Sequence, residues 1–186
     1  MATASVSDVA HAIRQRLPGV PTVKLHKLLY FAQGFHLAQV GEPLFHDVIE
    51  AWKYGPVVAE FWRADRYVSD REPAALDNDQ LNTIGYVCSR YGNNSGGDLM
   101  SITHDQPPWR DAFWRRVGWG EQHTIEVDTI RQYFLDVLKA DADDREIEVD
   151  QDQLAGLLTK AREHMNQRDA PGPVDTAASL LARLRG

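Results

Sequence analysis

Apolar residues recur at helical spacing along much of the chain, and the densest run lies between residues 22 and 41. Within this run, apolar side chains fall at i, i+3, i+4 and i+7, which places them on one face of a helix. The members of this stripe are Leu25, Leu28, Leu29, Ala32 and His36. Aromatic residues outside the stripe make the helix apolar around more than half of its circumference. We therefore expect a central helix with neighbours on several sides, started by Thr22 as N-cap and ended by Gly41.

The stretch after this helix is irregular and ends in an aromatic turn. Residues 48–52 are mostly apolar and favour a short strand or an extended passage beside the core. Trp52 and Tyr54 are two positions apart, so they would share one face of an extended segment. Gly55 permits a tight turn, and proline suits the first position of a helix. We therefore expect a helix that begins at Pro56 and ends near Val68.

Start and stop signals mark out the remaining helices of the domain. Ser7 and Asp8 are expected to cap a first helix, and Asp77 with Gln80 has the pattern of a capping box for a helix that reaches Tyr91. The other expected helices cover residues 96–103, 109–117 and 128–138, with Ser95 and Asp128 as the N-caps of the first and last. These patterns predict a mainly α fold, a compact single-domain helical bundle over residues 5–140 with at most short strands.

Residues 141–186 are expected to form a C-terminal helical extension. Residues 141–152 contain seven acidic residues and one basic residue, which favours a solvated acidic linker. An amphipathic helix is expected to follow, with Leu154, Leu157, Leu158, Ala161 and Met165 on its apolar face. A Pro/Gly breaker at residues 170–173 precedes a last small helix. The apolar face can dock on the chain's own domain, which we expect, or on a partner protein.

Composition and charge narrow the class of protein. Of the 186 residues, 43% are hydrophobic and 25% are charged, which is ordinary for a soluble globular protein. The net charge is −7, and residues 141–152 carry −6 of it, so the body lacks the basic field that binds nucleic acid. Cys88 is the single cysteine, which excludes an intramolecular disulfide and a thiolate metal cluster. No segment has the length and apolarity of a membrane span or of a signal peptide, so we expect a cytoplasmic protein.

Candidates for catalysis or for metal and cofactor binding are few, and we expect none of these activities. His26 and His36 are ten residues apart on one helix, which places them several turns apart and on different faces. His104 and Asp105, beside Trp109, are the best acid–base pair and would support a hydrolytic enzyme as an alternative function. We favour a structural role for His104, in which it completes the carbonyls at a helix end.

Aromatic residues near turns give the strongest indication of a binding surface. Core packing is the default for most of them, but turn tryptophans beside Gly or Pro are often partly exposed, where they anchor protein interfaces. We expect a partner protein to contact a set of such residues and the apolar face of the C-terminal helix. This set consists of Trp52, Tyr54, Trp109 and Trp119, with Leu154, Leu157 and Leu158 from the helix.

Three sequence blocks resemble the Panacea domain of SocA-like and GepA-like antitoxins. They are K-L-x-K-L-L-Y-F-A-Q-G-F-H-L-A from Lys24, then G-x-P-L-F from Gly41 with I-E-A-W-K-Y-G-P-V-V from Ile49, and T-H-x-x-x-P-W from Thr103 to Trp109. The third block has one residue more than the family's T-H-x-x-P-W. The resemblance covers residues 5–140 and implies an antitoxin that neutralises a toxin, encoded by the adjacent gene, by direct protein binding. At least one member resembles a proteolytic adaptor that hands its toxin to a cytoplasmic protease, so the resemblance leaves occlusion and delivery to a protease open as modes of neutralisation.

A DNA-binding autoregulator is the remaining alternative. Arg14, Arg16, Lys24 and Lys27 lie close together in the sequence and would form a modest basic patch. The overall acidity of the chain disfavours nucleic acid as a partner.

Overall fold

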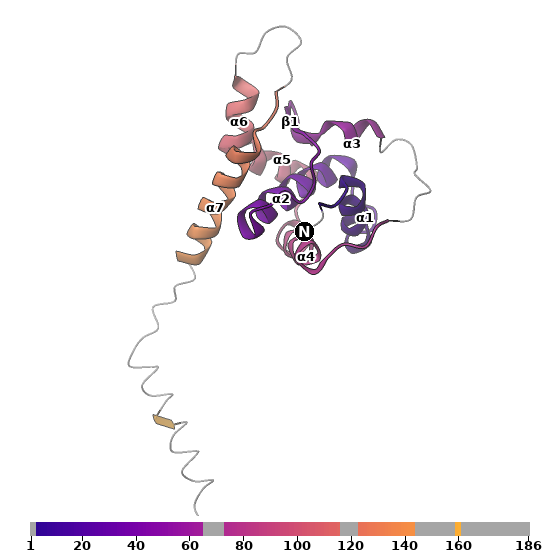
Figure 1. The fold of residues 1–186 in the computed structure, drawn as a ribbon. Helices are drawn as coiled ribbons and strands as arrows, with labels where there is room; N and C mark the ends of the chain where they lie inside the picture. The colour runs from indigo at the N-terminus through magenta and orange to yellow at the C-terminus, as the bar shows by residue number, and fades with distance from the viewer. Residues whose placement is uncertain (1–2, 65–72, 116–122, 144–158, 161–186) are drawn as a thin grey trace, which may run out of the picture. The chain divides into compact units, whose positions relative to one another are not determined.

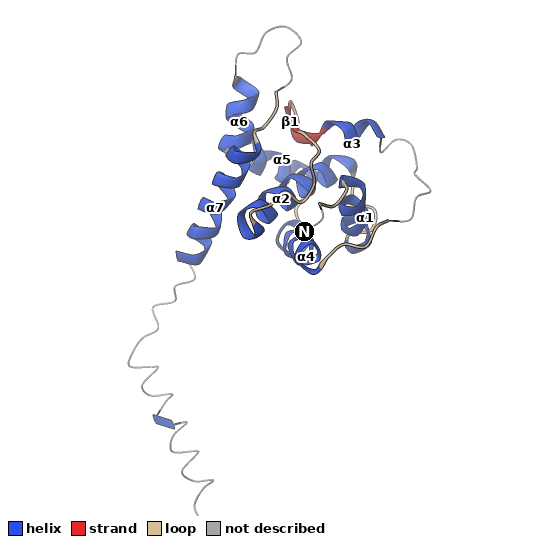
Figure 2. Cartoon of the chain, in the orientation of Figure 1, coloured by secondary structure: helices blue, strands red, loops and turns tan. Residues whose placement is uncertain are grey.

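The computed structural model describes residues 3–64, 73–115, 123–143 and 159–160 (Figure 1). The chain divides into two compact units, residues 1–142 and 143–186, and the description below concerns the first of them. Its described part is mainly α, as the sequence predicts, with one two-stranded antiparallel hairpin among the helices (Figure 2). The elements are α1 (Val6–Arg16), α2 (Thr22–Val40), β1 (Ile49–Trp52), β2 (Gly55–Val58), α3 (Ala59–Ala64), α4 (Asn78–Tyr91), α5 (Gly96–His104), α6 (Pro107–Trp114) and α7 (Val127–Asp143).

Helix α2 is the centre of the unit, which confirms the prediction for this segment. Every residue from Leu25 to Leu37 is buried, because α1, α4, α5 and β2 all pack against it. Gly41 ends the helix in the left-handed conformation with a φ of 90°, as expected. The N-cap is Pro21, so the prediction of Thr22 as N-cap is wrong, and Thr22 is the first helical residue.

Helix α1 begins earlier than its sequence signals suggest. The hydroxyl of Ser5 accepts a hydrogen bond from the backbone N–H of Asp8, so Ser5 is the N-cap and the prediction of Ser7 and Asp8 as caps is wrong. The physical reason is the side chain of Val6, which is buried and extends the apolar face of the helix by two residues toward the N-terminus.

The segment after β1 is where the prediction fails most clearly. Gly55, Pro56, Val57 and Val58 form strand β2, which pairs with β1 from Trp52↔Gly55 to Ile49↔Val58. The helix predicted from Pro56 starts only at Ala59, because residues that pair with a neighbouring strand cannot also adopt helical dihedral angles. The expectation of a short strand over residues 48–52 is confirmed. Residues 65–68 of the predicted helix lie outside the described residues.

Two of three helix starts follow the sequence signals closely. Asp77 and Gln80 form a capping box at α4, and Ser95 forms another with Asp98 at α5. Helix α7 begins at Val127, so Asp128 lies in its first turn and the prediction that it is the N-cap is wrong.

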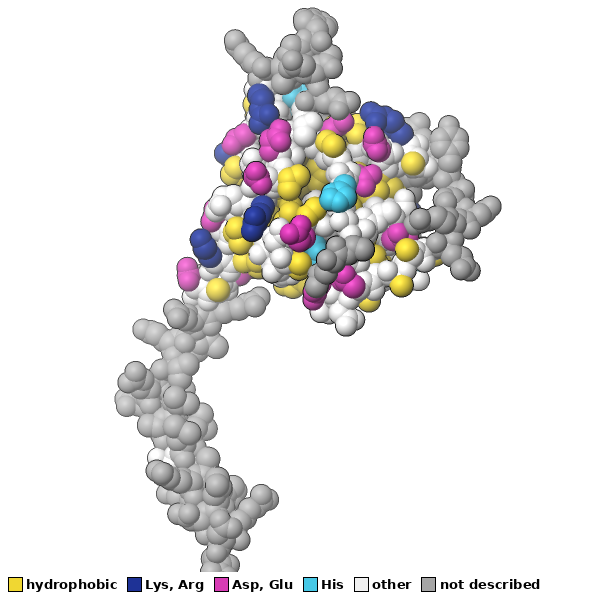
Figure 3. Space-filling model, in the orientation of Figure 1, with side chains coloured by type: hydrophobic (Ala, Val, Ile, Leu, Met, Phe, Trp, Pro, Cys, Tyr) yellow, Lys and Arg dark blue, Asp and Glu magenta, His cyan; other side chains and the backbone are white. Residues whose placement is uncertain are grey.

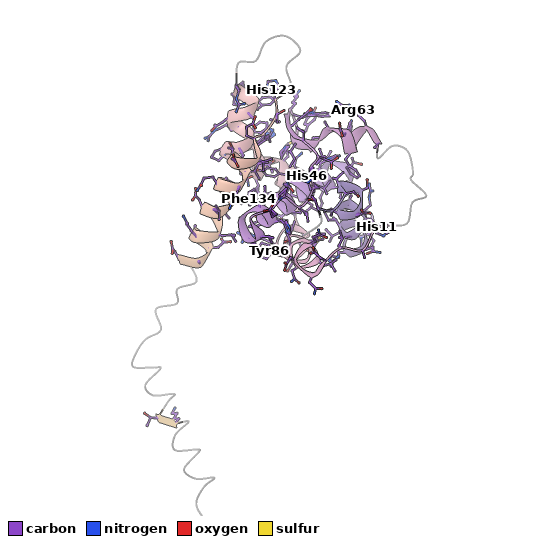
Figure 4. The ribbon with its side chains drawn as sticks, viewed as in Figure 1. His11, His46, Arg63, Tyr86, His123 and Phe134 are labelled. Carbon is purple, nitrogen blue, oxygen red and sulfur yellow. The ribbon has the colours of Figure 1, made fainter. Side chains whose placement is uncertain are left out.

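Helix α7 packs on α2 through the ring of Phe134, which lies against Gly34. Phe134 is buried against the backbone of Gly34, and a Cβ at Gly34 would overlap the Phe134 ring. Figure 4 shows Phe134 directed from α7 toward α2. Farther along α7, Asp141 forms an ion pair with Arg90 of α4. Within the described ranges, no helix is both long and apolar enough to cross a membrane.

Candidate functional site

A buried lysine joins the hairpin to the central helix. Lys27 of α2 is 1% exposed, and its Nζ donates a hydrogen bond to the carbonyl oxygen of Pro56 at 3.0 Å. Gly55 allows this approach, because a Cβ there would lie 2.5 Å from Lys27 Cε and 2.9 Å from Thr103 Oγ1. Burial lowers the pKa of Lys27 from 10.5 to about 8. The first motif block therefore holds the second in place.

A buried glutamine fixes the segment that leads into the hairpin. Gln33 Nε2 donates to the carbonyl oxygen of Phe45 at 3.0 Å. Its Oε1 accepts from the backbone N–H groups of Leu44 and Phe45 at 3.0 and 3.2 Å. One side chain of α2 thus satisfies three backbone groups of the G-x-P-L-F block, which would otherwise be buried without partners.

The third block closes on the same hairpin. Trp109 Nε1 donates to the carbonyl oxygen of Trp52 at 3.0 Å, and the His104 ring stacks on the indole of Trp109 with centroids 3.9 Å apart. Burial lowers the pKa of His104, the positive charge of Lys27 lowers it further, and the nearby carboxylate of Asp105 opposes both effects. His104 Nε2 is buried and has no hydrogen-bond partner among the described residues. The third block thus stacks aromatic rings beside the hairpin.

Aromatic side chains gather where the hairpin turn and α6 meet. We call Trp52, Tyr54, Trp62, Phe113 and Trp114 the aromatic surface. Tyr54 is 60% exposed and Trp114 is 73% exposed, which is unusual for such large apolar groups. The other three are half-buried and contact other aromatic rings. The ring centroids of Trp52 and Trp62 are 6.0 Å apart, and those of Phe113 and the core residue Trp109 are 4.7 Å apart.

Hydrogen bonds on both its side chain and its backbone fix Trp52, one member of the aromatic surface. Trp52 Nε1 donates to Glu50 Oε2 at 2.7 Å, and the Trp52 carbonyl accepts the bond from Trp109. Helix α6 packs on β1, so both parts of the surface rest on one support (Figure 1). Exposed aromatic rings on a rigid support are typical of protein-interface anchors.

Comparison with known proteins agrees with these motif blocks. Residues 25–110 match the family model described as "Antitoxin SocA-like, Panacea domain". These residues resemble a SocA-like Panacea domain, and the matched segment is a little under half of the chain. The chain is also 35% identical over 112 residues to the protein named Antitoxin SocA from Caulobacter vibrioides (strain NA1000 / CB15N). That match covers 48% of this chain and 58% of the relative, so the chain spans little more than half of the relative's length. No solved structure matches the chain.

The predicted contact residues that the structure describes differ in their exposure. Trp52 and Tyr54 lie on the aromatic surface. Trp109 is 5% exposed, so the expectation that it is partly exposed is wrong, because its indole supports the hairpin from inside. Trp119 and the leucines Leu154, Leu157 and Leu158 lie outside the described residues.

Three residues of the aromatic surface, Trp62, Phe113 and Trp114, were not among the predicted contacts. Trp114 follows Trp109 by five positions, which turns a helix by about 140° beyond a full turn and places the two indoles on opposite sides. Burial of Trp109 therefore entails exposure of Trp114, and this relation was readable from the sequence. Trp62 was not selected because the helix was wrongly predicted to begin at Pro56, which concealed its position just after the hairpin.

The structure removes one member of the basic patch that the DNA-binding alternative needs. Lys27 is buried, so its charge does not reach the surface. Lys24 Nζ donates to the carbonyl oxygen of Gly92 at 2.6 Å. Arg14 and Arg16 are exposed, with Arg14 over the ring of Phe61 and Arg16 donating to the carbonyl oxygen of Ala12.

The histidines of α2 contact different neighbours. His36 is buried and its Nδ1 lies 3.0 Å from Thr83 Oγ1, whose hydroxyl donates to the carbonyl of Asp79. His26 Nδ1 accepts from the backbone N–H of Val58 at 3.3 Å. Among the described residues, no group of three or more potential ligands is arranged to hold a metal ion.

Proposed function

We propose that this chain is the antitoxin of a toxin–antitoxin pair and that it neutralises a partner protein toxin by binding it directly. The match of residues 25–110 to the SocA-like Panacea domain carries this proposal. The relative named Antitoxin SocA supports it over a part of its length. The adjacent gene is the natural source of the toxin, and a cytoplasmic location goes with this proposal.

The aromatic surface supports a mechanism of neutralisation by contact. Tyr54 and Trp114 expose large rings whose burial in an interface would be favourable, and no catalytic group is required for this. Lys53 Nζ lies 5.5 Å from the Tyr54 ring centroid, which adds a cation at the edge of the surface. Direct binding through this surface is the function that the geometry favours.

Co-expression tests the proposal. The product of the adjacent reading frame is expected to arrest growth when expressed alone, and this chain is expected to restore growth and co-purify with it. Truncation of an interface anchor costs about 2 kcal/mol or more, so Trp114→Ala and Tyr54→Ala should each weaken the complex roughly thirtyfold. Val23→Ala removes a 43% exposed side chain on another part of the surface and should leave the dissociation constant unchanged. If all three variants bind the toxin with equal affinity, the aromatic surface is not part of the interface with the toxin.

Delivery of the toxin to a cytoplasmic protease is a separate prediction from the family resemblance. It requires that the toxin's half-life shortens when this chain is present, whereas neutralisation by occlusion leaves the half-life unchanged or lengthens it. A pulse-chase measurement of the toxin with and without this chain distinguishes the two mechanisms.

A further inference from the structure

We propose that a hollow beside β1 binds an extended segment of the toxin that carries an apolar side chain next to a lysine or arginine. The hollow is formed by residues 43 and 45–49, residues 124–127, Gln33 and Ile130. This inference rests on the proposed function for the identity of the partner. It adds a second contact, apart from the aromatic surface, and the chemistry that this contact recognises.

The hollow has the size and lining of a site for an apolar side chain. Its volume is about 240 Å³, and its floor consists of the buried residues Phe45, Ile49, Ile125 and Ile130. Val48 and Val127 stand at its edge and are each 48% exposed. They belong to the few large apolar side chains that the described surface exposes, and both line this one hollow.

The backbone at the hollow favours an extended occupant. Ala51 N–H donates to the His123 carbonyl at 2.7 Å, and Ile125 N–H donates to the Ile49 carbonyl at 2.9 Å. Residues 123–125 thus lie antiparallel to β1, with Thr124 opposite Glu50. In such a pair, the N–H and C=O of Thr124 point away from β1, toward the open edge. An extended peptide can pair with an edge of this kind while its side chains enter a neighbouring pocket.

The charges around the hollow specify a basic partner. Among the described residues, its lining includes the carboxylates of Asp47 and Glu126 and no lysine or arginine. Figure 3 shows acidic side chains among the hydrophobic ones around the central histidine of this face, and Figure 4 labels His46 at that place. Burial raises the pKa of Asp47, the charge of Glu60 raises it further, and its own backbone hydrogen bond and His46 oppose the rise. A cation from the partner would offset both the desolvation of Asp47 and its repulsion by Glu60.

The hollow and the aromatic surface are placed to contact the same bound protein. β1 begins with Ile49 at the hollow and ends with Trp52 on the aromatic surface, and three strand residues span roughly 10 Å. The paired segment makes the same connection, since Ile125 lines the hollow and His123 lies 6.1 Å from the Phe113 ring. Contacts about this far apart fit within one interface of ordinary size.

Matched lysine variants of the full-length chain test the hollow. Val48→Lys and Val127→Lys place a cation beside the proposed basic segment, whereas Val23→Lys makes the same change at an equally exposed valine elsewhere. With the co-purified toxin as probe, the first two variants should weaken binding about tenfold or more, and Val23→Lys should not. Glu126→Lys should weaken binding to a similar degree, in contrast to Asp136→Lys on the exposed side of α7. Wild-type affinity for all the hollow variants would overturn the inference.

A second readout separates this inference from the proposed function. Short synthetic peptides with one leucine flanked by lysines, by glutamates or by serines are titrated against wild type and Val48→Lys. Binding of the lysine-flanked peptide alone, lost in Val48→Lys, would support the hollow even if the chosen toxin fails to bind. Absence of peptide binding together with normal toxin binding by the hollow variants would overturn the inference and leave the proposed function standing.

One competing occupant belongs to the chain itself. Its last residues combine leucines with Arg183 and Arg185, which is the same chemistry. The double variant Arg183→Glu/Arg185→Glu of the full-length chain distinguishes the two occupants. Unchanged peptide affinity would support a site for the toxin, whereas a severalfold gain would mean that the tail occupies the hollow and would overturn the assignment to the toxin.

Discussion

Replacing the buried lysine Lys27 by an uncharged residue should abolish a rise in the free energy of unfolding with pH at mildly alkaline pH. The pKa of Lys27 is about 8 in the folded chain, against the ordinary lysine value of 10.5. The difference is about 2.5 units. At 1.36 kcal/mol per unit, burial of the charged form costs about 3 kcal/mol at neutral pH. Because the folded pKa is the lower of the two, the unfolded chain binds more protons between these values, and stability rises with pH in that window.

The magnitude over an accessible range follows from the same two values. Between pH 8 and pH 9.5, Lys27 should raise the free energy of unfolding by about 1.5 kcal/mol. Chemical denaturation at a series of pH values measures this change for wild type and for Lys27→Met. The methionine side chain keeps most of the packing but cannot titrate, so the wild-type minus variant difference should rise with pH by about 1.5 kcal/mol over this range.

Subtracting the variant's free energy of unfolding from that of wild type cancels the contributions of the other groups that titrate in this pH range. Burial raises the pKa of Cys88 and of several tyrosines, which lowers stability at high pH in both proteins alike. Lys53→Met, at the exposed hairpin turn, is the matched control and should retain the wild-type slope. An equal slope for wild type and Lys27→Met would refute the conclusion that a buried ammonium holds the hairpin. The absolute stability at pH 7 is a weaker test, because the variant also leaves the Pro56 carbonyl without its donor.

Three further predictions concern the core around α2. Gly34→Ala should destabilise the fold by about 1–3 kcal/mol because the new methyl group displaces the Phe134 ring, whereas Gly85→Ala meets no atom within 4 Å and should stabilise it by about 0.5–1 kcal/mol in the same denaturation assay. Leu28→Ala should cost about 2–5 kcal/mol, since Leu28 is fully buried, and a loss below half a kcal/mol would contradict the central position of α2. Burial lowers the pKa of His36, so stability should fall as the pH drops below the ordinary histidine value of about 6.5, and a His36→Gln variant should lose this dependence.

The local parts of the fold could be predicted from the sequence because local chemistry determines them. The capping boxes at Asp77 and Ser95 and the left-handed glycine at Gly41 each satisfy backbone groups within a few residues. The apolar circumference of α2 likewise follows from spacing alone. These features need no knowledge of which segments meet in space.

The hairpin could not be predicted in the same way, because pairing over a longer range decides it. Gly55-Pro56 has the local signature of a helix start, and only β1 and the donor on Lys27 make residues 55–58 a strand. The burial of Lys27 was partly readable, since it lies within a run of positions that the sequence already predicts to be surrounded. The prediction that Lys27 belongs to a surface patch relied on its charge and neglected its position in the helix. A lysine can be buried when a carbonyl oxygen accepts its hydrogen bond.

Several residues of the motif strings build the scaffold of the hairpin, whereas most of the exposed apolar side chains lie elsewhere. Lys27, Gln33 and Trp109 carry the resemblance, yet all three are buried and bind backbone groups of the hairpin or of the segment before it. Such residues constrain how the hairpin is held and cannot touch a partner directly. The exposed apolar residues Trp114, Val48 and Val127 lie outside the motif strings. Tyr54 is the exception, because it is exposed and lies within the second block. Domains that share the motif can therefore share the hairpin platform and differ in the partner, because a change at an exposed position alters the contact surface without disturbing the buried hydrogen bonds.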